Sequence, residues 1–327
     1  MITSKDISRI CGVSLGTVDR ALNGRPGISQ KTKEKILKVS RELGYRPHLA
    51  ARSLKTGKNW TIGVVLFDLD NHYFAQVLNS LVLCAHEEGY FLHLTLSEHK
   101  AERELECLHH LVSLPVDGLI IFPINKGAGF TRFTRLLNVP LVTLGNRVSA
   151  SIPFVSIDDK LAMGNCVEYL VGKGYRRIIY FSPPLVYRGK ENTYAVSERY
   201  MGYRHGMKLA GLEPVVLNEK HPKSKILELT KTTGEKTAVL CSSDIYALET
   251  LSILREAGVR VPEDVGVMGF DDIDFLSHTS PPLSSVSQNI DLLARTCFKV
   301  LKDLMEGKPD VPQVTLTDHR IVQRSSV

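Results

Sequence analysis

The chain has 327 residues, a length that suits two or three compact units better than one core. Its 43% hydrophobic and 23% charged residues are ordinary for a globular protein, and no apolar run is long enough to cross a bilayer. The net charge of +6 is unevenly placed, because the first sixty residues hold 13 basic and 4 acidic side chains and the rest hold 28 and 31. A basic head on a mildly acidic body is typical of a polyanion-binding module joined to a second module.

The N-terminus and the cysteines indicate the compartment. The first residues, Met1 to Asp6, contain neither an apolar signal core nor a small-residue cleavage site, so the protein is expected to stay in the cytoplasm. The six cysteines are scattered without a Cys-x-x-Cys pair. This spacing argues against a zinc ribbon or a redox dithiol and favours buried free thiols.

Residues 1–46 are predicted to form a small helix-turn-helix unit. Gly12 would end the first helix in a left-handed conformation, and the Gly- and Pro-containing loop 24–29 would separate the second helix from the third. Two short helices joined by a tight turn are the geometry that places a recognition helix in the DNA major groove. The predicted helices lie at 4–11, 15–22 and about 30–43, and are expected to start at Ser4, Ser14 and either Ser29 or Gln30.

The second helix leaves side chains on its outer or leading face that suit contact with DNA. Arg20 can make a forked pair of hydrogen bonds with guanine, and Leu15 can touch a thymine methyl group. Gly16 allows close approach of the backbone, and Thr17 can bond a phosphate. Leu15 could instead pack in the core, and Arg20 could be a solvated charge. The predicted DNA-contacting residues of the head are Ser14, Leu15, Gly16, Thr17, Arg20 and Asn23.

Two segments resemble a known family. The run Gly12-Val13-Ser14-x-x-Thr17-Val18-x-Arg20-x-Leu22-Asn23 resembles the head of the lactose/galactose repressor (LacI–GalR) family, and Tyr45-x-Pro47-x-x-Ala50-x-x-x-Leu54 resembles its hinge segment. The resemblance implies a sequence-specific DNA-binding transcriptional regulator, expected to be a repressor. It implies three parts: a helix-turn-helix head at 1–46, a hinge helix and linker at 47–59, and an effector-binding and dimerisation domain at 60–327.

The hinge is expected to depend on DNA for its order. An isolated helix at 47–54 is too short to be stable in water. The resemblance implies that it orders on DNA, where Leu54 wedges into the minor groove with His48 and Ala51 also in contact; Leu54 could instead pack on the body. Asp19 and His48 depart from the family, which usually has Ser and Asn there. Asp19 would either repel phosphate or accept a hydrogen bond from a cytosine amino group.

From residue 60 onward, β-branched apolar runs alternate with amphipathic helices. This alternation predicts an α/β body of doubly wound parallel sheets. The resemblance implies two lobes of the periplasmic-binding-protein type, lobe 1 at 61–158 and 290–318 and lobe 2 at 159–287 and 319–327. The predicted strands are 61–67, 91–96, 118–122, 141–144, 154–157, 177–181, 238–241, 265–270 and 284–287.

Ligands of such sheets bind beyond the carboxyl ends of the strands, so polar residues just past each strand are the candidates. An acid, two arginines and amides facing one cleft suit a hydroxyl-rich ligand, and Phe74 could pack on the apolar face of its ring. The predicted effector-binding residues are Asp70, Phe74, Asn146, Arg147, Arg199, Ser243, Asp271 and Gln288.

The family pattern is matched at Arg199, Asp271 and Gln288 and is broken at Ser243, where Asn is usual. Because Ser is shorter, the ligand or its orientation is expected to differ there. Structural roles are the alternatives for three further residues: Asp244 and Asp272 are expected to cap helices, and Arg147 could form an ion pair between the lobes.

The expected function is that of a homodimeric regulator. Two heads would read the half-sites of a near-palindromic DNA operator, and a sugar, polyol or derivative bound between the lobes would change operator affinity. The sequence lacks common catalytic motifs and metal-ligand spacings, so no enzyme activity, cofactor, metal or membrane contact is expected. A solute-binding protein without a regulatory role is the alternative, opposed by the basic head and the missing export signal. An enzyme using the same cleft is a third reading, and no nucleophile–base pair supports it.

Overall fold

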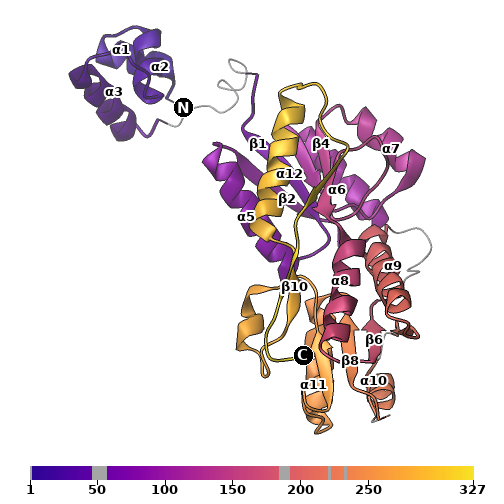
Figure 1. Cartoon of the computed structure of the whole chain (residues 1–327). Helices are drawn as coiled ribbons and strands as arrows, with labels where there is room; N and C mark the ends of the chain where they lie inside the picture. Colours follow the sequence, from indigo (N-terminus) through magenta and orange to yellow (C-terminus); the bar gives the residue numbers. More distant parts are fainter. Residues whose placement is uncertain (1, 46–56, 184–191, 220–221, 232–233) are drawn as a thin grey trace. The chain divides into compact units, whose positions relative to one another are not determined.

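The computed structural model describes residues 2–45, 57–183, 192–219, 222–231 and 234–327. The chain divides into two compact units, one ending at Asn59 and one starting at Trp60. The predicted hinge contacts at His48, Ala51 and Leu54 lie outside the described residues. We call the first unit the head and the second the body (Figure 1).

The head consists of three helices, α1 (Ser4–Cys11), α2 (Leu15–Leu22) and α3 (Gln30–Glu42). Ile7, Val18 and Ile36 come from different helices and are completely buried, so one side chain from each helix forms the centre of a small core. Gly12 ends α1 with φ 66°, a left-handed conformation that suits glycine. The three predicted helices are confirmed.

The N-caps of the head differ from the prediction at one helix. Thr3, and not Ser4, caps α1: its hydroxyl accepts a hydrogen bond from the Asp6 amide, and the Asp6 carboxylate accepts one from the Thr3 amide. This reciprocal capping box satisfies two amides that the helix leaves free, which a cap at Ser4 would not do. Ser14 caps α2 as predicted, and Ser29 caps α3.

The first lobe of the body is a six-stranded parallel sheet in the order β11-β5-β4-β3-β1-β2. Helices α5 (His72–Glu87) and α12 (Ile290–Met305) cover one face, and α6 (Ala101–Ser113) and α7 (Gly127–Leu136) cover the other (Figure 1). The strands are β1 (Thr61–Leu66), β2 (Phe91–Leu96), β3 (Gly118–Ile121), β4 (Leu141–Leu144), β5 (Phe154–Ile157) and β11 (Val314–Thr317).

The second lobe is a four-stranded parallel sheet in the order β7-β6-β8-β9. Helices α8 (Asp159–Gly172) and α9 (Tyr194–Leu209) pack on one face, and α10 (Lys223–Leu229) and α11 (Asp244–Glu256) on the other. A 3-10 helix, η1 (Asp274–His278), follows β9. The strands are β6 (Arg177–Phe181), β7 (Val215–Leu217), β8 (Thr237–Cys241) and β9 (Val265–Met268).

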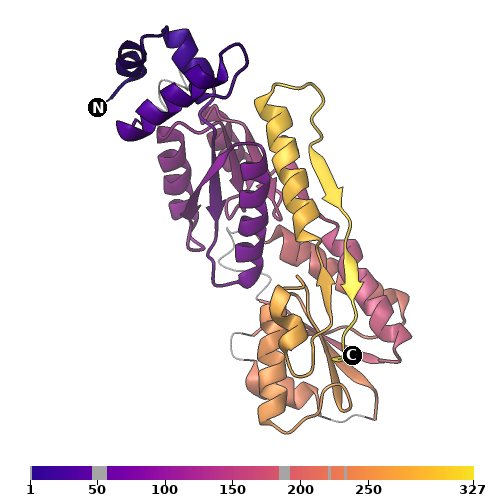
Figure 2. The ribbon, with the colours of Figure 1, turned by 90° about the vertical axis from the view of Figure 1, so that its left-hand side faces the viewer.

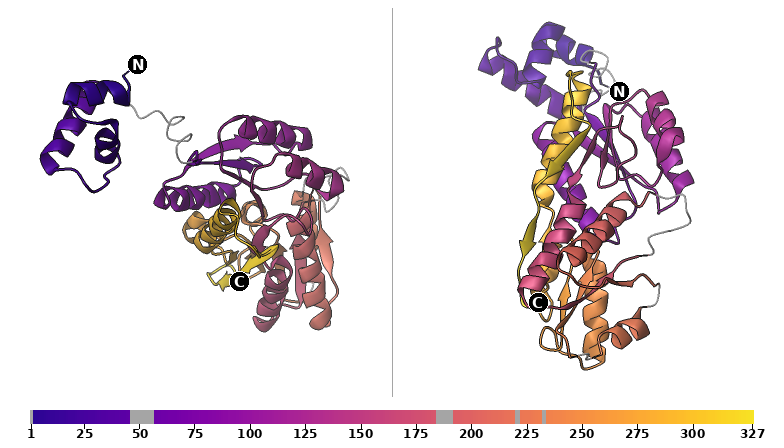
Figure 3. Two further views of the ribbon diagram at one scale, coloured as in Figure 1. Left: turned by 90° about the horizontal axis from the view of Figure 1, so that it is seen from above. Right: turned by 45° about the vertical axis from the view of Figure 1, so that its right-hand side comes forward.

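The chain passes between the lobes more than once. After α12 and β11 in the first lobe it returns to the second, where β12 (Arg320–Val322) pairs antiparallel with β10 (Ser285–Ser287) (Figures 2 and 3). At the C-terminus the buried Ser326 hydroxyl donates to the Val267 carbonyl and accepts from the Ser284 amide. The last residues are therefore an integral part of the second lobe.

The fold class is confirmed as a small all-α head with an α/β two-lobed body. The sequence missed three short strands: β7, an apolar run of only three residues, and β11 and β12, which include polar residues and are largely half-exposed. All six cysteines are buried and unpaired, as expected. In the part of the chain that the structure covers, no helix combines the length and apolar character needed to span a bilayer.

Candidate functional site

The leading face of α2 is open to solvent. Leu15 is 45% exposed, so core packing does not explain this residue. Arg20 and Asn23 are also exposed, and Thr17 is half-buried. A Cβ at Gly16 would contact only the Ser14 hydroxyl, so the backbone there is accessible from outside. These side chains form one exposed surface, as a DNA-reading helix requires.

The carboxylate of Asp19, which departs from the family pattern, is engaged within the head. It accepts a hydrogen bond from Asn23 Nδ2 at 3.1 Å and lies 3.4 Å from Arg25 Nη1. Arg25 therefore offsets the negative charge that Asp19 would present to phosphate. The same contact ties the end of α2 to the loop that precedes α3.

In the body, Arg199 on α9 is the centre of a buried polar cluster. Its Nε donates to Asp159 Oδ1 at 2.7 Å, and its Nη1 donates to the Ser242 carbonyl at 2.6 Å and lies 3.5 Å from Asp271 Oδ1. The guanidinium carbon also lies 3.8 Å from the centroid of the Phe270 ring. With its side chain 11% exposed, Arg199 is held from three sides by the second lobe.

Gln288 connects this cluster to the first lobe. Its Nε2 donates to Asp271 Oδ1 at 2.7 Å, and its Oε1 accepts from the Tyr73 hydroxyl at 3.0 Å. Tyr73 belongs to α5 of the first lobe, whereas Asp271 follows β9 of the second. Three of the predicted residues, Arg199, Asp271 and Gln288, therefore lie together in one network that spans both lobes.

The charges of the cluster do not balance. One guanidinium faces two carboxylates, those of Asp159 and Asp271, and burial raises the pKa of both carboxyls while Arg199 lowers it. The backbone of Asp271 is also strained, with φ 121°, a conformation that costs on the order of 1–3 kcal/mol outside glycine. Strain and unbalanced buried charge together indicate a binding site more than a stabilising ion pair.

The candidates beside β1 have different environments. Asp70 is exposed, and its amide donates to Asp68 Oδ1. The Asp68 carboxylate also accepts from the Asn71 amide and contacts His99. Phe74 is half-buried and packs edge-on against Phe67 and Phe122. The structure thus places an aromatic cluster at the carboxyl end of the first sheet, with Asp68 committed to the local loop.

Asn146 follows β4, but its amide is used inside the protein. Its Nδ2 donates to the carbonyls of Pro123 and Asn192, and its Oδ1 accepts from the Ala195 amide at 3.0 Å. Three of the four hydrogen bonds that an asparagine side chain can make are therefore occupied. Arg147 is half-buried, and its carbonyl accepts from Asn192 Nδ2 at 3.0 Å, so it contacts the segment that leads into α9 and forms no ion pair within the described residues.

The polar residues around α11 and β9 were expected either to bind the effector or to have a structural role. Ser243 is half-buried and its hydroxyl makes no cap bond to α11. Asp244 is buried and accepts from the Ser285 hydroxyl and the Ile273 amide, and Asp272 pairs with Arg324 at 2.8 Å. The prediction that Asp244 and Asp272 cap helices is wrong, because both tie the loop after β9 to other strands and to the C-terminal segment.

Two members of the cluster, Tyr73 and Asp159, were missed by sequence reasoning. Asp159 is the second residue after β5, so the rule that selects polar residues past each strand would have found it if it had been applied to that strand. Tyr73 gave no comparable signal, because a tyrosine beside Phe74 in an amphipathic helix is indistinguishable from a core residue until its hydroxyl partner is known.

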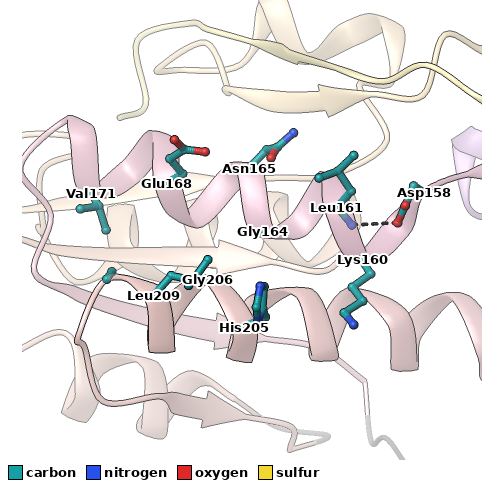
Figure 4. Close-up of a pocket in the computed structure, with 11 residues that line it drawn as sticks. Asp158, Lys160, Leu161, Gly164, Asn165, Glu168, Val171, His205, Gly206 and Leu209 are labelled. Atoms are coloured by element: carbon teal, nitrogen blue, oxygen red, sulfur yellow. Dashed lines mark hydrogen bonds between the residues drawn. The ribbon is translucent and has the colours of Figure 1, made fainter.

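A separate groove of about 550 Å³ runs between α8 and α9 on the second lobe (Figure 4). Its floor includes Gly164 and Gly206, and exposed apolar side chains such as Leu209 lie along it. The predicted effector residues do not line this groove. Three of them, Arg199, Asp271 and Gln288, meet instead in the buried Arg199 cluster. The described residues also contain no group of His, Cys, Asp or Glu suited to holding a metal.

Comparisons with known proteins agree with this division of the chain. Residues 3–48 match the family model of bacterial regulatory proteins, lacI family, and residues 167–327 match a periplasmic binding protein-like domain. The HTH-type transcriptional regulator RegA of Clostridium saccharobutylicum is 31% identical over 336 residues, covering 100% of this chain and 99% of the relative.

Two solved structures are similar along the whole chain. The lac repressor dimer bound to operator and the anti-inducer ONPF has a TM-score of 0.82 and 26% identity, with 99% of this chain and 98% of that chain covered. The complex of the transcriptional regulator CelR with cellobiose has a TM-score of 0.71 and 25% identity, with both chains covered completely.

Proposed function

Because the chain belongs to the lacI family of bacterial regulatory proteins, and is therefore a DNA-binding transcriptional regulator controlled by an effector, we propose the form that this control takes here. The protein is a cytoplasmic homodimeric repressor without enzymatic activity, and a sugar or polyol bound at the Arg199 cluster sets its affinity for a near-palindromic operator.

The observation on which the effector class rests is the surplus of hydrogen-bond acceptors around Arg199. Asp271 Oδ1 accepts from Gln288 and lies near Arg199, but Asp271 Oδ2 has no protein donor within the described residues. A ligand hydroxyl can donate to that oxygen, and such charge-assisted hydrogen bonds contribute about 1.5–3 kcal/mol each. A ligand anion would instead add to the excess negative charge, which disfavours it.

The first lobe supplies the apolar part of the same site. Phe74, Phe67 and Phe122 form a cluster in which the rings meet edge to face, with ring centroids 5.1–6.3 Å apart. Sugars and polyols present C–H faces as well as hydroxyls, so aromatic rings on one lobe and acceptors on the other match their two surfaces. The relative CelR has been solved with cellobiose, which is consistent with a ligand of this class.

On the DNA side, the exposed α2 surface (Ser14, Leu15, Gly16, Thr17, Arg20 and Asn23) supports reading of a half-site. A two-fold dimer presents two such surfaces, and the solved lac repressor binds its operator as a dimer. Effector binding changes the relative arrangement of the lobes, and operator and effector are therefore coupled reciprocally. The DNA contacts proposed for the hinge residues His48, Ala51 and Leu54 rest on the sequence alone.

The proposal is tested in two steps with the full chain. A thermal-shift screen over sugars and polyols identifies the effector, since a ligand at about 100 times its Kd stabilises the folded state by about 2.7 kcal/mol. Fluorescence anisotropy then compares DNA from the gene's own promoter region with random DNA of equal length, with and without that ligand. Salt-sensitive, sequence-selective binding that the ligand alters is expected.

Arg20→Ala provides the sharpest variant, with Arg41→Ala on the exposed face of α3 as its matched control. Arg20→Ala should reduce the preference for promoter DNA, by about 1–3 kcal/mol if one guanine contact is lost, and the control should keep it. Equal affinity of the parent protein for random and promoter DNA would refute the proposal. Sugar binding without any DNA selectivity would instead favour a solute-binding protein.

A further inference from the structure

Helix α9 contacts the first lobe as well as the second, through the residues at its N-terminus. The amide of Asn192 donates to the Ile124 carbonyl at 2.7 Å, and its Nδ2 donates to the Arg147 carbonyl at 3.0 Å and to the Asn125 carbonyl at 3.5 Å. These carbonyls belong to the loops that follow β3 and β4 of the first lobe. Asn192, from the second lobe, is thus hydrogen-bonded to two loops of the other lobe.

Asn146 completes this connection from the first-lobe side. Its amide bonds the Asn192 carbonyl at 3.2 Å and the Ala195 amide at 3.0 Å, so it holds both ends of the segment 192–195. Between them, the Tyr194 ring packs edge-on against Phe154 of β5 at 5.5 Å. Asn146 and Asn192 are each only 8% exposed, and buried amides that lose their partners are costly to leave unpaired.

Arg199 lies one helical turn beyond Ala195 on the same helix. Its guanidinium is anchored to Asp159 and to the Ser242 carbonyl of the second lobe. The first turn of α9 is therefore held by one lobe, and the next turn by the other.

The packing of α9 on α8 prevents the two turns from moving independently. A Cβ at Gly202 would overlap the Lys160 carbonyl, and one at Gly206 would lie 2.8 Å from Val167 Cβ, so the helices are in backbone-level contact. Gly206 and Gly164 lie where the two helices meet (Figure 4). Elements packed this closely move as rigid bodies, because a close-packed interface has few intermediate arrangements.

We propose that Asn146 and Asn192 are positioning residues that form a latch between the lobes, so that the arrangement of the lobes and the position of Arg199 change together. The inference rests on the proposed effector role of Arg199 for its meaning in regulation. A ligand that shifts Arg199 or Asp159 moves α9, and the movement reaches the first lobe through the segment 192–195. Without the latch, the site can still form on the second lobe, but the first lobe is no longer tied to it.

The latch is tested with spin labels on the full chain at two exposed positions, Leu136→Cys on α7 and Leu209→Cys on α9. The native cysteines are all buried and should not react. Pulsed EPR measures the distance between the lobes in this background and in Asn146→Ala, Asn192→Ala and the control Asn79→Ala, which alters an exposed asparagine of α5. Both latch variants should broaden or shift the distribution, and the control should not.

Hydrogen exchange supplies the second readout. The Ala195 amide should exchange at least about tenfold faster in Asn146→Ala, because its acceptor is removed, while amides in the centre of β8 keep their protection. Circular dichroism shows which variants are folded; if Asn146→Ala is not, Asn192→Ala decides, since it keeps the backbone bond to Ile124. A folded latch variant with an unchanged distance distribution overturns the inference. The measurement needs neither DNA nor a sugar, so its failure is distinct from failure of the proposed function.

Discussion

Replacing Asp271 by Asn tests the effector site most directly. The substitution keeps the shape of the side chain and the oxygen that accepts from Gln288 Nε2 at 2.7 Å. At pH values above the raised pKa of Asp271, it removes one negative charge from a cluster in which a single guanidinium faces two carboxylates. Arg199 retains Asp159 as its closest carboxylate partner, at 2.7 Å, so the substitution does not leave an unpaired cation.

The expected change in stability is small because two large effects oppose each other. At an effective dielectric constant of about 20, unit charges at the Arg199–Asp271 distance attract by about 5 kcal/mol. Burying a carboxylate costs several kcal/mol, and the unfavourable interaction with Asp159 disappears with it. We therefore expect the free energy of unfolding to change by about 1 kcal/mol or less. Loss of one charge-assisted hydrogen bond to a ligand hydroxyl should weaken effector binding by about 1.5–3 kcal/mol, or roughly 10- to 150-fold.

The assay combines three measurements on full-length Asp271→Asn: the thermal midpoint, effector affinity by calorimetry and operator affinity without effector. Only effector affinity should change substantially. Asp272→Asn is the matched control, because this adjacent carboxylate is also largely buried but pairs with Arg324. A large fall in the thermal midpoint together with loss of operator binding would show that Asp271 has a structural role. An equal loss of effector affinity in Asp272→Asn would show that the effect is not specific to Asp271.

Three further outcomes are expected. Leu54→Ala should weaken binding to promoter DNA much more than to random DNA in a titration, and an unchanged ratio of the two affinities speaks against insertion into the minor groove. In the absence of ligand, the thermal midpoint should decrease as the pH is raised from about 5 to about 8. Burial raises the pKa of Asp271 above its ordinary value of 3.8, so the folded state binds an extra proton. That proton, and the stability it gives, is lost as the pH rises through the raised pKa. Asp271→Asn should flatten this dependence; an equally steep fall would assign it to other groups. Gly202→Ala should lower the thermal midpoint, because the new Cβ overlaps the Lys160 carbonyl and costs about 1–3 kcal/mol of stability. Gly129→Ala in α7 is the control, because a Cβ there has open space around it. Equal midpoints for the two variants would contradict close packing of α9 on α8.

The architecture was predictable wherever local chemistry determines it. The head helices follow from polar caps and apolar spacing, and the error at α1 was one residue, because Thr3 and Ser4 are both good caps and only the reciprocal bond with Asp6 selects Thr3. Buried parallel strands were found because they are continuous apolar runs. Strand β11 was missed since it lies at a sheet edge with a half-exposed pattern, where its pairing with β5 and not its composition makes it a strand.

The candidate site was predictable in part. The position of polar residues past strand ends correctly brought Asp271 and Gln288 together, because parallel strands deliver their carboxyl ends to one edge. The same rule selected Asn146 without indicating its partners. Those partners, Asn192 and Ala195, are about fifty residues away in sequence and belong to the other lobe, so no local pattern could identify them.

The distribution of occupied polar groups limits how a ligand can be held. On the first lobe, the Asp68 carboxylate accepts from two backbone amides and contacts His99, and Asn146 is engaged by the latch. On the second lobe, Asp271 retains an oxygen without a protein donor and the Ser243 hydroxyl makes no cap bond. Polar recognition should therefore come mainly from the second lobe, while the first contributes aromatic surface and responds through the latch. It follows that Asn146→Ala should alter the response to the ligand more than the direct contacts to it, opposite to the pattern expected for Asp271→Asn.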